Sequence, residues 1–232
     1  MIETATWTVF LAALVTALAT GLGALPFLAT RTMSARWEAI GHAAAAGLML
    51  AASGGLLFEG VGRGLGATLA GAVLGAAAMA LGQRMIAARA DLHIGALHGA
   101  DARKALLIVG VMTVHSAAEG IGVGVSFGGG QDLGLLMTLA IALHNVPEGL
   151  AISLVLIPRG VSVAAAAGWS VFSSLPQPIL AVPAFAFVAL FAPLLPVGLG
   201  LAAGAMLWMI AADMVPESLA RAGPRPVVTA MA

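Results

Sequence analysis

The chain has 232 residues, of which 61% are hydrophobic and only 9% are charged, and its mean hydropathy is +1.06. Soluble domains carry roughly 25% charged residues, so this composition excludes a water-soluble domain and indicates that lipid is the solvent. The zero net charge without a basic run excludes a nucleic-acid-binding surface, and the absence of cysteine excludes disulfides, thiolate metal sites and cysteine nucleophiles.

Apolar runs long enough to cross a bilayer follow one another along the chain. A spanning helix needs about 20 apolar residues. Punctuating charges and turn residues place seven spans near residues 7–30, 37–59, 65–87, 104–128, 133–157, 161–191 and 195–219. We therefore expect an all-α polytopic membrane helix bundle that forms one transmembrane domain over residues 1–232.

The distribution of cations predicts the orientation of this bundle. No Lys or Arg precedes the first apolar run at Trp7, so we expect a retained helix rather than a signal peptide, with the N-terminus outside. With seven spans, only Arg63 then lies outside. The other nine cations lie inside, as the positive-inside rule requires: Arg31, Arg36, Arg84, Arg89, Arg103, Lys104, Arg159, Arg221 and Arg225. The C-terminus is expected inside, and the cell (inner) membrane is the expected location.

The sixth span is predicted to be a broken helix. It contains Pro176, Pro178 and Pro183, and each proline removes a backbone hydrogen bond that lipid cannot replace. Such a helix is expected to line protein or a cavity rather than face lipid.

The fourth and fifth spans each contain the pattern H-x-x-x-E-G. It reads His115 to Gly120 in one span and His144 to Gly149 in the other. A spacing of four residues places His and Glu on one face of each helix, and two such faces in contact would make a four-ligand pocket.

Two imidazoles and two carboxylates suit Zn²⁺ or Fe²⁺, and the carboxylates would neutralise a divalent cation. Pro147 leaves the carbonyl of Leu143 without its helical donor, so this oxygen and the Asn145 side chain are further candidate ligands. The alternative is that each His and Glu simply pair inside the bundle and specify its packing.

Other polar residues have weaker claims to a role. His42 is expected at the inner interface, and His93 and His98 are expected in an inner loop that either accepts the metal or is simply solvated. Three carboxylates toward membrane ends could attract or release cations, or could be solvated: Glu59, Asp213 and Glu217.

The paired motifs resemble the fourth and fifth helices of the ZIP (Zrt/Irt-like) metal transporters, most closely the bacterial GufA-like branch. The likeness extends, in order, to residues 19–26, to residues 47–59 and to residues 213–218, and so covers nearly the whole chain. It implies a secondary transporter that moves Zn²⁺, or Fe²⁺, Mn²⁺ or Cd²⁺, toward the cytoplasm without ATP. It also implies a homodimer, and an elevator motion of spans one, four, five and six past the others.

Two departures from the family pattern matter. Many relatives hold a second metal with an Asn or Asp after each motif His and a Glu on the sixth helix. Here these positions read Ser116, Asn145 and Gln177, so this neighbouring site lacks its carboxylates and we expect one tightly bound metal. The family also has an eighth helix, which we do not expect in this sequence.

Two alternatives to a carrier remain at this point. An intramembrane metal-dependent hydrolase would use the same ligands to activate water, but it needs a spare carboxylate as general base, and the zinc-protease motif H-E-x-x-H is absent. We therefore do not expect an enzyme. A passive metal channel would have the same ligands without alternating access.

Overall fold

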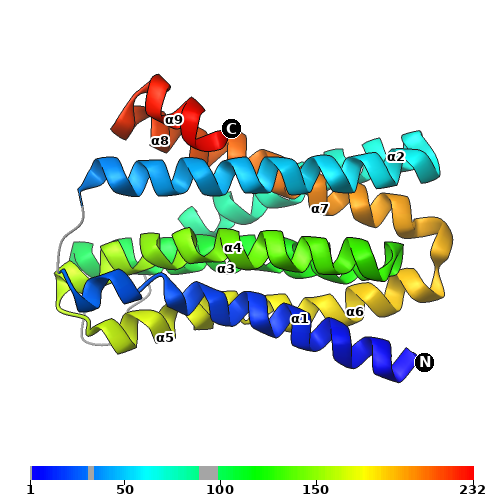
Figure 1. Cartoon of the computed structure of the whole chain (residues 1–232), viewed down its shortest axis with the longest axis horizontal. Helices are drawn as coiled ribbons and strands as arrows, with labels where there is room; N and C mark the ends of the chain where they lie inside the picture. Colours follow the sequence, from blue (N-terminus) through cyan, green and yellow to red (C-terminus); the bar gives the residue numbers. More distant parts are fainter. Residues whose placement is uncertain (1, 31–33, 89–98) are drawn as a thin grey trace.

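The computed structural model describes residues 2–30, 34–88 and 99–232, and it shows a bundle of long helices lying side by side (Figure 1). The helices are α1 (Ile2–Leu22), α2 (Ala35–Ala88), α3 (Gly99–Gly129), α4 (Gln131–Leu156), α5 (Val163–Ser174), α6 (Pro176–Leu190), α7 (Leu195–Met209), α8 (Val215–Ala222) and α9 (Pro224–Met231). Short 3₁₀ turns follow α1, α4 and α6, and a π-helical turn, Ile210–Met214, joins α7 to α8. The all-α prediction is confirmed.

Six stretches of the described chain are long and apolar enough to cross a membrane, and the one within α2, Ala39–Met85, has 47 residues. That length is about twice what one crossing needs. The backbone leaves helical geometry at Gly64, and a Cβ at Gly60 would lie 2.8 Å from the Thr68 side chain. Residues eight apart on a straight helix are separated by about 12 Å, so α2 folds back at Gly64 and contributes two crossings. The seven predicted crossings are thereby accounted for.

The predicted break in the sixth span is also confirmed. α5 ends at Ser174, Leu175 forms the connection, and α6 begins at Pro176, where a proline costs no helical hydrogen bond. Gln177, in the first turn of α6, is fully buried. The break thus places a polar side chain inside the bundle.

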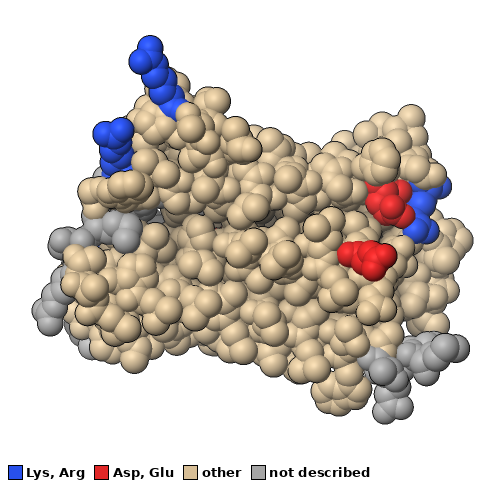
Figure 2. Space-filling view, in the orientation of Figure 1, with Lys and Arg blue, Asp and Glu red and all other residues tan. Residues whose placement is uncertain are grey.

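The cations mark the two ends of the bundle. Of the six whose side chains the structure describes, Arg63 lies at the end where α2 folds back. The other five lie at the opposite end, where α2 begins and α4 finishes (Figure 1): Arg36, Arg84, Arg159, Arg221 and Arg225. Figure 2 shows Lys and Arg side chains at the left end, and at the right end it shows acidic side chains with a Lys or Arg side chain beside them. By the positive-inside rule we assign the left end to the cytoplasm.

Glycines allow the second half of α2 and α7 to pack backbone against backbone. A Cβ at Gly71 or Gly75 would collide with the backbone of α7, and one at Gly200 or Gly204 would collide with the backbone of α2. Small residues spaced by four let membrane helices approach closely where no hydrophobic effect drives them together. This pair forms one side of the bundle.

α3 and α4 form the middle layer of the bundle. They lie between the α2–α7 pair on one side and the layer of α1, α5 and α6 on the other (Figure 1). Contact with that layer is equally close. A Cβ at Gly149 of α4 would collide with the Thr20 carbonyl of α1, and one at Gly120 of α3 would lie 2.6 Å from the Gln177 carbonyl of α6. The two motif glycines, Gly120 and Gly149, therefore allow the helices that carry the site to pack closely against their neighbours.

The described chain contains no eighth crossing, as the sequence predicts. After α8 the chain turns at Gly223 (φ 76°), and α9 has eight residues, which span only about 12 Å. α9 packs against the first half of α2, where the Met231 backbone lies against Gly47.

The close α2–α7 contact predicts a specific stability effect. Gly75→Ala places a methyl group against the Leu201 carbonyl, and we expect a loss of about 1–3 kcal/mol in the free energy of unfolding, as for other overpacked interiors. The control is Gly66→Ala, on the same half of α2 with nothing within 4 Å. The melting temperature of the purified protein in detergent should fall for Gly75→Ala only, and equal melting temperatures would contradict the packing.

Candidate metal centre

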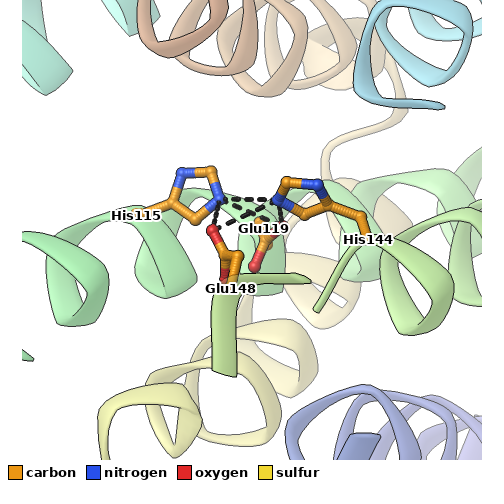
Figure 3. Close-up of side chains that lie close together, drawn as sticks. All are labelled: His115, Glu119, His144 and Glu148. Atoms are coloured by element: carbon orange, nitrogen blue, oxygen red, sulfur yellow. Dashed lines mark hydrogen bonds and ion pairs between the residues drawn. The ribbon is translucent and has the colours of Figure 1, made fainter. Parts of the chain in front are cut away.

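Four side chains from two antiparallel helices meet near the middle of the bundle (Figure 3). His115 and Glu119 come from α3, and His144 and Glu148 come from α4. All four side chains are at most 5% exposed. The prediction that each i, i+4 pair shares a helix face and that the two faces meet is confirmed.

The four side chains present one atom each to a common point. His115 Nε2 lies 3.2 Å from His144 Nε2, 3.2 Å from Glu119 Oε1 and 2.6 Å from Glu148 Oε1. His144 Nε2 lies 3.5 Å from Glu119 Oε1 and 3.2 Å from Glu148 Oε1. Each imidazole therefore contacts both carboxylates rather than only the one on its own helix.

Four of these five separations, 3.2–3.5 Å, are close to the edges of a tetrahedral metal site, and the His115 Nε2–Glu148 Oε1 separation is shorter at 2.6 Å. Zinc bonds to His N and carboxylate O of about 2.0–2.1 Å place tetrahedral ligands roughly 3.3 Å apart. Glu119 Oε1 and Glu148 Oε1 contact the two imidazoles and have no other hydrogen-bond partner among the described residues, and Glu148 Oε2 is buried with none. Since carboxylates with so few partners are costly to bury, this donor set fits a divalent cation better than the alternative of two independent His–Glu pairs.

Gln177, on α6, contacts side chains from α1, α3 and α4. Its Nε2 donates to Glu119 Oε2 at 2.7 Å, and its Oε1 accepts from Asn145 Nδ2 at 3.1 Å and lies 2.5 Å from Thr16 Oγ1. Asn145 Nδ2 also donates to the Thr16 carbonyl at 2.7 Å. The predicted neighbours Asn145 and Gln177 therefore lie beside the four-ligand cluster, in a neutral hydrogen-bonded network.

Ser116 is buried beside the same network but contacts hydroxyls. Its Oγ lies 3.5 Å from Ser174 Oγ, which lies 2.8 Å from Thr20 Oγ1. Sequence reasoning missed Thr16, Thr20 and Ser174 as neighbours of the site. The signal available was two threonines spaced by four in the otherwise apolar first span.

A cavity of about 430 Å³ connects the centre with the inner end of the bundle. Glu148 is the one cluster residue that lines it. Its walls combine apolar side chains with polar groups from α2, the 3₁₀ turn after α4, the π-helical turn and α8: His42, Arg159, Asp213 and Glu217. His42 and two of the three carboxylates with uncertain roles therefore face the inner cavity.

The remaining polar residues fall elsewhere. Glu59 lies at the outer end and pairs with Arg63 at 2.6 Å, and Arg63 also donates to the Gly129 carbonyl at 3.0 Å. His93 and His98 lie outside the residues that the structure describes. Asp213, on the π-helical turn, accepts from Gln83 Nε2 at 2.5 Å.

Removing one cluster ligand should weaken metal binding far more than removing a nearby histidine outside it. We expect His144→Ala to lower Zn²⁺ affinity beyond the roughly 10–100-fold typical of outer-shell changes, because the imidazole supplies one of the four ligand atoms. His42→Ala, outside the cluster, is the control. Competition with a fluorescent chelator measures both, and similar losses in the two variants would contradict the assignment.

Comparison with known proteins gives a consistent result. The sequence profile of the ZIP zinc transporters matches residues 87–229. The chain is 46% identical over 226 residues to a putative zinc transporter of Arabidopsis thaliana, covering 96% of this chain but only 36% of that protein. It is 35% identical over 223 residues to the zinc transporter GufA of Myxococcus xanthus, covering 89% of this chain and 87% of that protein. With the zinc transporter ZIPB of Bordetella bronchiseptica it shares 35% identity over 218 residues, 86% of this chain and 69% of that one. The chain is therefore a multi-pass membrane protein that belongs to the ZIP zinc transporter family.

Proposed function

We propose that this chain carries Zn²⁺ across the membrane toward the cytoplasm, with Fe²⁺, Mn²⁺ and Cd²⁺ as further candidate ions. The observation that carries the proposal is the convergence of two imidazole nitrogens and two carboxylate oxygens on one point inside the bundle. Ionisable groups at this depth are costly and mark ion pathways. Relatives named as zinc transporters support Zn²⁺ as the ion.

The surroundings of the centre favour a carrier over a channel. Toward the cytoplasm, the cavity reaches Glu148. Toward the outside, the next turns of α3 and α4 bring Val123, Met137 and Ile141, each at most 2% exposed, so apolar side chains fill that route. An ion can then enter from outside only after helices move, as alternating access requires.

The site offers little support for an intramembrane hydrolase. Both carboxylates belong to the four-ligand cluster, and within the described residues no other group of three or more metal-binding side chains is found. A hydrolase of this type needs a general base besides its ligands. The elevator motion and the homodimer that the family resemblance implies remain predictions.

Uptake of Zn²⁺ into proteoliposomes that contain a chelating dye tests the proposal. We expect saturable uptake by the wild type and loss of at least about 90% of it in His115→Ala and Glu148→Ala, because each variant lacks one of four ligands. Ser153→Ala is the control, since this buried hydroxyl on α4 has no hydrogen-bond partner and its removal should be nearly neutral. Absence of uptake by a folded, metal-binding wild type would contradict a carrier, and rapid unsaturated flux would indicate a channel.

We further propose that one metal ion binds per chain. A second ion beside the first would need carboxylates where Ser116, Asn145 and Gln177 provide only neutral groups. The Gln177 amide N–H, moreover, donates to Glu119 Oε2, and a donor in that place competes with a second cation for the same oxygen.

Metal content after dialysis measures this stoichiometry. We expect one Zn²⁺ per chain in the wild type and up to two in Gln177→Glu, because the substitution replaces the donor by a third carboxylate. Gln177→Leu, which removes the donor without adding charge, should not gain a second ion. Two retained ions per wild-type chain would contradict the single-metal proposal.

A further inference from the structure

The two glutamates of the repeated motif are equivalent in sequence but not in their surroundings. Glu119 is fully buried and accepts a 2.7 Å hydrogen bond from Gln177 through Oε2. Glu148 Oε1 lies 2.6 Å from His115 Nε2, but among the described residues neither Glu148 oxygen has a hydrogen-bond partner outside the four-residue cluster. Glu148 also lines the inner cavity, whereas Glu119 does not. One carboxylate is thus held by a residue outside the cluster, and the other contacts only the two imidazoles of the cluster.

Gln177 is itself well placed to act as the anchor of Glu119. Its Oε1 contacts Asn145 from α4 and Thr16 from α1, and this fixes the amide with its N–H toward Glu119. Glu119 can turn away from the centre only by giving up a charge-assisted hydrogen bond inside the protein, where water cannot replace it.

Glu148 can move at a lower cost. Its contacts with His115 and His144 lie within the cluster, so no hydrogen bond to a residue outside the cluster breaks when it turns, and a turn toward the cavity brings it to space that the inner end can hydrate. Pro147, beside it on α4, lines the same cavity. The other three ligands, His115, Glu119 and His144, would then remain around the ion while one coordination position opens on the cytoplasmic side.

We propose that the two glutamates have different roles when the ion is released. Glu119, anchored by the positioning residue Gln177, stays bound at the centre, while Glu148 detaches first and lets the ion pass to the inner cavity. This inference rests on the proposed function and adds an order of ligand exchange to it. Release is then a stepwise substitution at Glu148, in which water or a cavity group takes the position that the Glu148 oxygen leaves.

Cysteine labelling tests the asymmetry, because the natural chain has no cysteine. A membrane-impermeant methanethiosulfonate is applied to the cytoplasmic side of inside-out vesicles that contain single-cysteine variants. We expect Glu148→Cys to react and Glu119→Cys to remain protected. Met112→Cys, on the cavity wall, is the positive control, and Ile152→Cys, buried on α4 one turn beyond Glu148, is the negative control. Equal labelling of the two glutamate positions, labelling of position 119 alone, or labelling of neither would overturn the proposal.

Zn²⁺ release into excess chelator tests the anchor. Gln177→Leu should speed release from the purified protein roughly tenfold or more, the effect of losing a hydrogen bond to a charged group. Ser173→Ala is the matched control, because its hydroxyl lies in the same broken span and donates to the Ser170 carbonyl rather than to the cluster. Equal release rates in the two variants would overturn the anchoring role of Gln177. If Gln177→Leu binds no Zn²⁺, the proposal is decided by the cysteine labelling of positions 119 and 148. Labelling reads accessibility whether or not Zn²⁺ is transported, so failure of this inference is distinguishable from failure of the proposed function.

Discussion

The burial of two carboxylates and two imidazoles between membrane helices is the constraint on which the rest of the structure depends. A carboxylate taken out of water without a partner costs several kcal/mol or more, and lipid offers no hydrogen bond to reduce that cost. The four ligand atoms therefore have to lie within a few ångströms of one another. That requires α3 and α4 to be in close contact, and it requires their neighbours to hold them there.

The neighbours meet this requirement through small residues. Gly120 and Gly149, the last residues of the two motifs, allow the backbones of α6 and α1 to approach the helices that carry the ligands. The close approach of α6 brings Gln177 to Glu119, and that of α1 brings Thr16 to Gln177. The glycine of the H-x-x-x-E-G pattern thus serves the site through packing, while His and Glu serve it through their ligand atoms. On the far side, the α2–α7 pair is packed by its own glycines and contributes no ligand to the cluster.

Much of this arrangement could be predicted from the sequence, because lipid leaves few solutions. The lengths of the apolar runs predicted seven crossings, and the prolines predicted the break between α5 and α6. The spacing of His and Glu predicted the four-ligand centre. The reversal of α2 at Gly64 was predicted as a gap between two spans. In the structure the helix continues directly on both sides of Gly64, with no loop between the two crossings.

The unpredicted features depend on tertiary contacts. Thr16 and Thr20 reach the site only because α1 packs against α4, and nothing in their local sequence specifies that neighbour. The different environments of Glu119 and Glu148 are likewise invisible in two copies of one motif, since they arise from Gln177 on one side and the cavity on the other.

X-ray absorption at the zinc edge tests the central claim most directly, because it reports the atoms bound to the ion in the loaded protein. A single shared centre predicts a four-coordinate Zn²⁺ with nitrogen and oxygen ligands at about 2.0–2.1 Å, and an imidazole signal that corresponds to two histidines and falls to one in His144→Ala. A six-coordinate spectrum, or an imidazole signal unchanged by His144→Ala, would contradict a centre built from both helices.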